Sequence, residues 1–216
     1  MADNKQEIFE FRGVDNLYVA EVLTDDNESE GGYTCETPVY LAPVAEVGKS
    51  TDSSSEAHYY DNKAMIVVNS ESADKISITM APPVLDKLAK IIGKSFDAET
   101  GMMVDGPRQN KYFALMYRTK GTDGAYRYVS RLKGTFSIPE DSNATENDGT
   151  DTTNTSIEYT GIYTTHEFTK GMYNGSKWEK AGAKGVVVDT RYGLADVSKF
   201  FESVQTPDTV KVKAQG

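Results

Sequence analysis

The sequence is poor in the residues that build disulfides, metal sites and membrane spans. Its 216 residues include one cysteine, two histidines and one tryptophan. Cys35 cannot form a disulfide within the chain, and the isolated His58 and His166 are too few for a zinc or iron site, which needs three or four converging ligands. The longest apolar runs, such as 64–68, span about five residues, whereas a membrane helix needs about twenty. We therefore expect no disulfide framework, no metal or cofactor and no membrane insertion.

Basic residues are also in the minority. The chain carries 23 Lys and Arg against 33 Asp and Glu, a formal net charge of −10. Sequence-independent affinity for nucleic acid depends on basic side chains that displace counterions, so tight DNA binding is disfavoured, whereas loose passage of DNA is not. The first ten residues mix charges and lack the apolar core of a secretory signal, so we expect no export by that route.

No catalytic constellation is visible. The sequence has no Gly-x-Ser-x-Gly elbow, and both histidines lie in runs that are rich in Tyr and Thr. Two Gly-Lys-Ser triplets, 48–50 and 93–95, lack the glycine that a phosphate-binding loop needs five residues earlier, where Pro43 and Leu88 stand instead. We expect a loop at Lys49 and a helix C-terminus at Gly93. The sequence predicts no catalytic residues and a protein that is not an enzyme.

Hydrophobic periodicity predicts a mainly β fold. Eight segments alternate apolar and polar residues or are rich in β-branched and aromatic side chains. The turn-forming cluster 119–124 joins two of them into the clearest hairpin of the chain. About eight to ten strands indicate a sandwich or barrel. The expected strands are 14–23, 37–47, 56–68, 75–80, 111–118, 125–133, 155–165 and 184–190.

Two segments show helical spacing of apolar residues. The first, 84–92, follows Pro83, and the second, 194–204, precedes Pro207. Each has one apolar stripe, and we expect the second to cover a face of the sheet. The predicted fold class is therefore mainly β with flanking helices (α+β), in which one principal helix packs on a β-sandwich or barrel and a short helix lies near the C-terminus.

Acidic residues are concentrated in two stretches without any basic residue, 21–48 and 139–158. The segment 140–154 is too polar to pack, and we expect a mobile loop there. An oxygen-ligated calcium ion in this loop is an alternative to a solvated loop. We divide the chain into an N-terminal arm (1–10), a domain (11–204, with the acidic loop 139–154 inserted) and a C-terminal arm or linker (205–216).

Tyrosines are abundant on the expected strands. Three interpretations are open for them: packing in the core and across strands, contact between subunits, or stacking on sugars or bases. The tyrosines concerned are Tyr59, Tyr60, Tyr112, Tyr117, Tyr126, Tyr128, Tyr159 and Tyr163.

An ordered series of short motifs resembles a known family. The series contains Phe11-Arg-Gly-Val-Asp-Asn-Leu-Tyr-Val-Ala20, Thr37-Pro-Val-Tyr-Leu-Ala-Pro-Val-Ala-Glu46, Tyr60-Asp-Asn62, Ile76-Ser-Ile-Thr-Met80 before a helix, Tyr112-Phe-Ala-Leu-Met-Tyr-Arg118, Tyr126-Arg-Tyr-Val129, Lys133-Gly-Thr-Phe-Ser-Ile-Pro139 and Ile157-Glu-Tyr-Thr-Gly-Ile-Tyr163. This order is similar to that of the phage major tail protein family, the tail tube proteins of phages with long non-contractile tails, found mainly on Gram-positive hosts. The resemblance covers about residues 11 to 204.

The resemblance implies a structural protein of the virion tail, assembled in the host cytoplasm. Its fold would be a tail-tube-type sandwich or barrel. Its partners would be further copies of itself in stacked hexameric rings, the tape measure protein, the tail terminator and tail tip proteins, and DNA in transient passage. Such a family has no catalytic residues to assign.

An acidic lumen would let DNA slide because carboxylates repel phosphate. The polar strands around 51–61 and 155–166 are the candidates for the lumen, with Asp52, Glu56, Asp61 and Glu158 as its charges. The alternatives are a monomeric β-sandwich that binds carbohydrate and a bacterial secretion-type tube protein.

Overall fold

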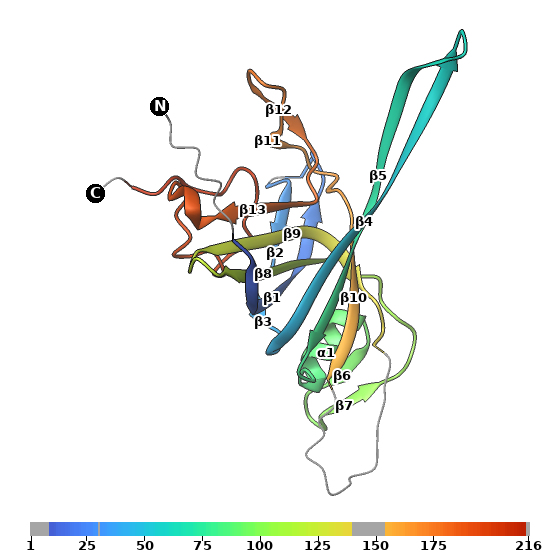
Figure 1. The fold of residues 1–216 in the computed structure, drawn as a ribbon. Coiled ribbons are helices and arrows are strands. Elements are labelled where there is room, and N and C mark those ends of the chain that lie inside the picture. Colours follow the sequence, from blue (N-terminus) through green and yellow to red (C-terminus); the bar gives the residue numbers. More distant parts are fainter. Residues whose placement is uncertain (1–8, 30, 140–153, 215–216) are drawn as a thin grey trace, which may run out of the picture.

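The computed structural model describes residues 9–29, 31–139 and 154–214 (Figure 1). Most of the expected N-terminal arm and of the expected acidic loop fall outside these residues. The described chain forms thirteen strands, one α-helix and one 3-10 helix. They are β1 (Phe11–Asp25), β2 (Tyr33–Cys35), β3 (Val39–Tyr40), β4 (Val44–Tyr60), β5 (Lys63–Met80), α1 (Leu85–Ile92), β6 (Ser95–Asp97), β7 (Met102–Val104), β8 (Phe113–Gly121), β9 (Tyr126–Phe136), β10 (Thr155–Gly161), β11 (Phe168–Tyr173), β12 (Trp178–Ala181), β13 (Gly185–Asp189) and η1 (Thr190–Tyr192). The mainly β fold with a packed helix is confirmed.

Nine strands form one antiparallel sheet in the order β2-β1-β8-β9-β10-β5-β4, with β3 paired to β1 and β13 paired to β9. The expected hairpin of 111–118 and 125–133 is confirmed as β8 and β9. Two small hairpins, β6–β7 and β11–β12, lie outside the main sheet. In Figure 1 the sheet is strongly curled, with α1 at one end and the β4–β5 hairpin extending past the other.

The sheet branches along β9. Residues 127–131 of β9 pair with β13, and residues 134–136 pair with β10. Gly134 lies at this change of partner, where a Cβ atom would meet the carbonyl oxygen of Thr160 and the ring of Tyr159, each at 2.4 Å. A glycine is therefore required for the close approach of β9 to β10. The branch sends β10, β5 and β4 away from the remaining strands.

The core has two parts, one on each face of β8. Phe113, Leu115 and Tyr117 belong to the part beneath α1, whereas Ala114 and Met116 pack with Phe200 and Val204. The continuous apolar run of β8 follows from this arrangement, because both of its faces are covered.

Helix α1 confirms the first predicted helix. Ala89, Ile91 and Ile92 are its buried residues. The helix ends at Gly93, which adopts the left-handed conformation with φ 72° and donates its N–H to the carbonyl oxygens of Ala89 and Lys90. The expectation of a helix C-terminus at the second Gly-Lys-Ser triplet is confirmed. The first triplet is different, because Lys49 lies within β4 and not in a loop.

The second predicted helix, 194–204, is wrong. Its first residues are held in an extended conformation by the C-terminal segment: Ala195 forms a β-bridge with Val212, and Lys213 donates to the carbonyl oxygen of Leu194. A helix cannot begin while its backbone is committed to this pairing, and only turns follow at 198–202. Phe200 and Val204 are nevertheless buried against the sheet, as the apolar stripe predicted. The segment after Val204, left open as an arm or linker, lies against the same part of the core through Val210.

The expected strand 56–68 is also wrong, because it contains a turn. Asp61 and Asn62 have positive φ angles of 49° and 62°, and they separate β4 from β5. Two consecutive residues with positive φ are typical of the two-residue turn that joins tightly paired strands. The expected strand 37–47 is likewise divided, into β3 and the first residues of β4.

Candidate functional site

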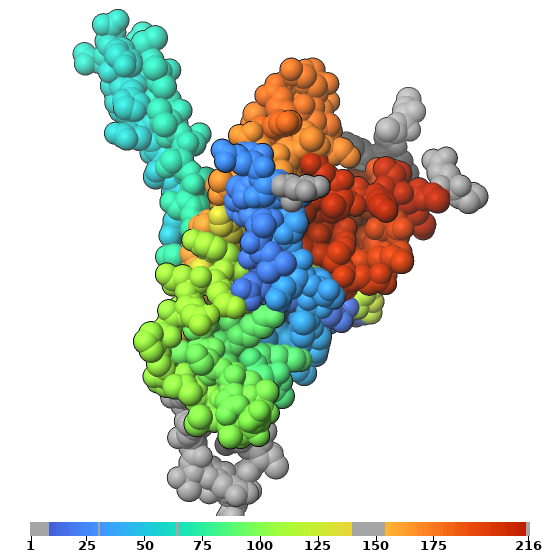
Figure 2. All heavy atoms as spheres, turned by 180° about the vertical axis from the view of Figure 1, so that it is seen from behind, coloured from blue at the N-terminus to red at the C-terminus, as the bar shows by residue number. Residues whose placement is uncertain are grey.

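The most prominent feature of the molecule is the outer part of the β4–β5 hairpin. Strand β10 accompanies β5 from Met80 to Asp74. Beyond that point β4 and β5 pair only with each other, from Ser53 opposite Glu71 to Tyr60 opposite Lys63. We call residues 53–71 the hairpin arm. Figures 1 and 2 show it projecting as a narrow ribbon well beyond the body of the molecule.

The hairpin arm has a polar shaft and an apolar tip. The shaft is rich in serine, and Ser54 and Ser70 share a hydrogen bond of 2.6 Å across the two strands. The tip exposes six large apolar or aromatic side chains, each with more than half of its surface accessible. We call this group the arm tip: Tyr59, Tyr60, Met65, Ile66, Val67 and Val68. Clusters of exposed apolar side chains are typical of surfaces that bind another molecule, so the arm tip is a candidate contact surface.

A buried carboxylate fixes the hairpin where it leaves the sheet. The Asp74 side chain is 2% exposed and lies 3.2 Å from Lys49 Nζ, 3.2 Å from Arg131 Nη1 and 3.4 Å from Lys184 Nζ. Thr51 Oγ1 donates a further hydrogen bond of 2.7 Å to it. Burial alone would raise the pKa of Asp74, but the hydrogen bonds from Thr51 and Lys49 and the charge of Arg131 outweigh burial and lower the pKa.

Lys184 extends this network to Glu71, at the base of the arm. Its ammonium group lies 2.8 Å from Glu71 Oε1, donates to the carbonyl oxygen of Ser72, and sits 4.8 Å from the ring centre of Tyr163. Burial would lower the pKa of Lys184, but the hydrogen bond to Glu71 and the charge of Asp74 raise it. We call the five charged residues of this network the root cluster: Lys49, Glu71, Asp74, Arg131 and Lys184.

Two of the four predicted lumen carboxylates share one face of the sheet. Ile76, Ile78, Ile157 and Tyr159 point into the core, so the residues between them on β5 and β10 face outward. Glu158 lies on this outward face opposite Ser77.

Asp52 reaches the same face from β4, where its carboxylate is 3.2 Å from Lys75 Nζ. Gly48 also faces outward, opposite Ser77, where a Cβ atom would meet the serine hydroxyl at 2.8 Å. The other two predicted carboxylates are elsewhere: Glu56 is exposed on the arm, and Asp61 forms its turn.

Sequence reasoning missed Glu46, which the register places opposite Thr79 on the outward face. The face therefore carries three carboxylates and one ammonium group, with small polar side chains between them. Its residues are Glu46, Gly48, Ser50, Asp52, Lys75, Ser77, Thr79, Ser156, Glu158 and Thr160. We call it the polar sheet face.

The strand tyrosines divide between core and surface. Tyr117, Tyr128 and Tyr159 are buried and Tyr126 is partly buried, whereas Tyr59, Tyr60, Tyr112 and Tyr163 are exposed. Packing therefore accounts for about half of them, and contact with other molecules remains open for the others.

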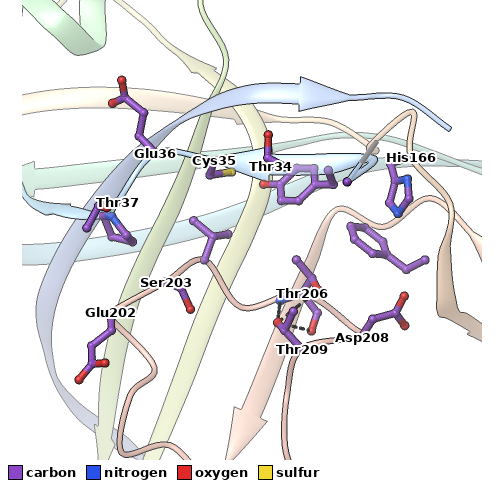
Figure 3. Close-up of a pocket in the computed structure, with 15 residues that line it drawn as sticks. Thr34, Cys35, Glu36, Thr37, His166, Glu202, Ser203, Thr206, Asp208 and Thr209 are labelled. Carbon is purple, nitrogen blue, oxygen red and sulfur yellow. Dashed lines mark hydrogen bonds between the residues drawn. The ribbon is translucent and has the colours of Figure 1, made fainter. Parts of the chain in front are cut away.

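A groove of about 480 Å³ lies between β2 and the C-terminal segment 202–209 (Figure 3). Burial raises the pKa of the Cys35 thiol in this groove to about 11, and a protonated thiol is a poor nucleophile. Asp208 is engaged in holding the chain together, because it accepts the backbone N–H groups of Thr169 and Lys170. These groups of the groove serve packing and loop structure.

Within the described ranges, no group of three or more His, Cys, Asp or Glu side chains is arranged to hold a metal ion. The helices of the described part of the chain are all too short or too polar to cross a membrane. The sequence matches no protein-family model, and no curated protein matches it. The arm, the root cluster and the polar sheet face are the features of the described chain that bear on its function.

Proposed function

We propose that this chain is the subunit of a phage tail tube, a structural protein that assembles into stacked hexameric rings and forms a conduit for DNA. The observation that carries the proposal is the hairpin arm, residues 53–71, in which β4 and β5 pair only with each other among the described residues. An isolated two-stranded ribbon is marginally stable in water. An arm that is long, apolar at its tip and unsupported by its own chain is suited to contact with further copies.

The free edge of the main sheet supports the same proposal. Strand β4 lies at the edge and is 17 residues long. A long exposed edge is a template for pairing with another chain. The register of β4 against β5 shifts at three places, between 44 and 46, between 51 and 53 and between 58 and 59, and the stretches between these places are regular. In a tube, the sheets of neighbouring subunits close into one barrel, and each edge is covered by the next copy.

The polar sheet face fits the lining of such a barrel. Glu46, Asp52 and Glu158 outnumber Lys75, so the face carries a net charge of −2. Its remaining side chains are small and neutral, so few groups on this face could bind DNA as it passes. A lining of this charge repels phosphate and lets DNA pass without adhesion. Glu56 and Asp61 would extend the acidic lining along the arm.

The cellular setting follows from the tube. The subunit would assemble in the host cytoplasm around a tape measure protein, between the terminator and tip proteins of the tail, and would remain in the virion. Its function requires assembly and passage of DNA, and no covalent chemistry.

Electron microscopy of the purified protein tests the proposal. The protein is concentrated, incubated for days and imaged by negative stain, with light scattering in parallel. We expect rings or tubes with a central hole. A compact monomer that persists even with tape measure and tail tip proteins added would contradict the proposal and favour the monomeric carbohydrate-binding alternative.

A matched pair of valines tests the role of the arm. Val68 in the arm tip and Val187 on β13 are each 51% exposed in the monomer. We expect Val68→Asp to raise the concentration needed for assembly at least about tenfold, because a buried carboxylate costs more than the 1.4 kcal/mol that a factor of ten represents. Val187→Asp should assemble as the wild type does. Equal assembly of the two variants would remove the arm from the interface.

The lining has its own test. Tubes with Asp52→Lys and Glu158→Lys present added positive charge on the polar sheet face. We expect these tubes to retain short DNA at low salt and to release it as salt is raised, whereas wild-type tubes retain none. Identical behaviour of the two would place this face away from the lumen.

A further inference from the structure

A small apolar pocket lies at the end of the molecule opposite the arm. Its walls are formed by Val19 and Phe113 from the sheet, Val39 from β3 and Ile91 from α1. Its volume is about 210 Å³, below the 300–1,000 Å³ of ordinary small-molecule sites. A pocket of this size suits one large side chain of a protein partner. We call it the β3–α1 pocket.

The rim of the pocket is charged. Lys87 and Lys90 of α1 border it, together with Asp86 and Glu21. Lys87 Nζ donates 2.6 Å to the carbonyl oxygen of Tyr40 and so stays beside the opening. Apolar walls with a polar rim match tyrosine, which has an apolar ring and a hydroxyl group that needs a hydrogen-bond partner.

The arm tip offers such side chains. Tyr59 and Tyr60 are 69% and 56% exposed in the described chain. The turn of the arm carries Asp61 and Lys63, and the rim of the pocket carries Lys87 and Lys90 beside Asp86 and Glu21, so neither surface has a net charge that would oppose contact. The tip and the pocket are therefore matched in size and in polarity.

The positions of the arm tip and the pocket in the fold show which chain could supply the tyrosine. Figure 1 places the arm tip and α1 at opposite ends of the molecule, so one chain cannot bring its own tip to its own pocket. We propose that the β3–α1 pocket receives a tyrosine of the arm tip from a second copy of this chain. The contact is head-to-tail and each copy carries both halves, so it repeats without closing and extends a filament.

This inference rests on the proposed function and deepens it, because it names the contact between successive rings. Pairing of strands around one ring uses the edges of the sheet. The contact between tip and pocket lies along the direction of the arm and connects one ring to the next. Ring formation and stacking should therefore be separable by mutation.

Three variants test the contact. Tyr59→Asp with Tyr60→Asp replaces both tyrosines of the arm tip. Val39→Asp places a charge in the wall of the pocket, at a side chain that is 44% exposed. Val84→Asp is the control, since Val84 is also exposed and lies at the start of α1 outside the pocket. Circular dichroism confirms that each variant is folded before its assembly is imaged.

We expect the tip and pocket variants to form single rings and the control to form tubes of wild-type length. Mixing preformed rings of the two defective variants should give particles two rings long, because one intact tip meets one intact pocket. Pairs of rings formed by the pocket variant alone would indicate contact between tips and overturn the inference. Tubes of wild-type length formed by either defective variant would also overturn the inference, but they would not contradict the proposed tube.

A cross-link gives a second readout. Tyr60→Cys and Val39→Cys are made separately in a Cys35→Ser background and mixed under an added thiol oxidant. We expect a disulfide-linked dimer in the mixture and much less in either protein alone. If the wild type forms no rings or tubes, the proposed function is contradicted. If tubes form well but the mixed dimer is absent, only the contact between tip and pocket is contradicted.

Discussion

The two ends of the β4–β5 hairpin are built on opposite principles. At the root, Asp74 is buried among three cationic side chains and β10 pairs alongside β5. In the arm, the same two strands have only each other, and apolar side chains face solvent. The charges at one end are paired within the chain, whereas the other end leaves apolar side chains exposed, and we propose that a partner covers them.

The contrast shows how the direction of a two-stranded hairpin can be fixed at its base. A hairpin that left the sheet without side-chain contacts would sample many directions. The root cluster connects β4 through Lys49, β9 through Arg131 and the segment before β13 through Lys184 to one carboxylate of β5. In the proposed assembly, a partner would meet the arm in a defined direction, and less conformational entropy would be lost on binding.

The largest effect is expected from removing the charge at the centre of the root cluster. Asp74→Asn leaves Lys49, Arg131 and Lys184 with Glu71 as the single acid of the cluster. Loss of one partner from a buried ion network costs about 3–5 kcal/mol. Here the Arg131 and Lys184 side chains, 13% and 8% exposed, lose their central carboxylate and only Glu71 remains. Urea denaturation of the monomer measures this as a fall in the free energy of unfolding.

Asp52→Asn is the matched control for that change. Asp52 also pairs with a lysine at 3.2 Å, but its side chain is 69% exposed. Exposed ion pairs contribute about 0–1 kcal/mol, so this variant should unfold close to the wild type. Similar losses in the two variants would show that burial at the root does not distinguish the two ends of the hairpin.

Acid should weaken the root selectively. The pKa of Asp74 is lowered in the folded protein, so its contribution to stability is complete above the pKa of an unfolded aspartate, about 3.9, and declines as the pH falls below it. We expect the difference in free energy of unfolding between wild type and Asp74→Asn to be constant from pH 7 to 5 and to shrink below pH 4. Urea titrations at each pH measure it. A difference that grows in acid would mean that the carboxylate is destabilising.

Much of the fold follows from periodicity alone. The alternation of Ile76, Ile78 and Met80 predicts a half-buried strand, and the spacing of Leu88, Ile91 and Ile92 predicts α1, because each stripe matches one local geometry. The helix predicted at 194–204 failed for a reason that no local pattern contains. Its backbone is taken by residues 211–213, which lie far along the chain.

The site was less accessible to prediction than the fold. Asp74 continues the alternation of Ile76 and Ile78, which places a charge on the buried face and signals the root cluster. Its partners Arg131 and Lys184 come from remote strands, and no spacing in the sequence brings them together. The turn at Asp61 and Asn62 carried a signal as well, since both residue types tolerate positive φ. It was hidden by the continuous β propensity on either side.

The smallest expected change in stability concerns two hydroxyl groups of β4 that lie three residues apart. Thr51 Oγ1 donates 2.7 Å to Asp74 at the root, whereas Ser54 Oγ shares its 2.6 Å hydrogen bond with Ser70 in solvent. We expect Thr51→Val to lower the free energy of unfolding by about 1.5–3 kcal/mol, as for hydrogen bonds to charged groups. Ser54→Ala should change it by less than about 0.5 kcal/mol, as for other exposed sites. Urea unfolding of both variants measures the difference across three residues of one strand. Equal losses would mean that the arm is as firmly held as the root, and the hairpin would then be a uniform element with no boundary at Asp74.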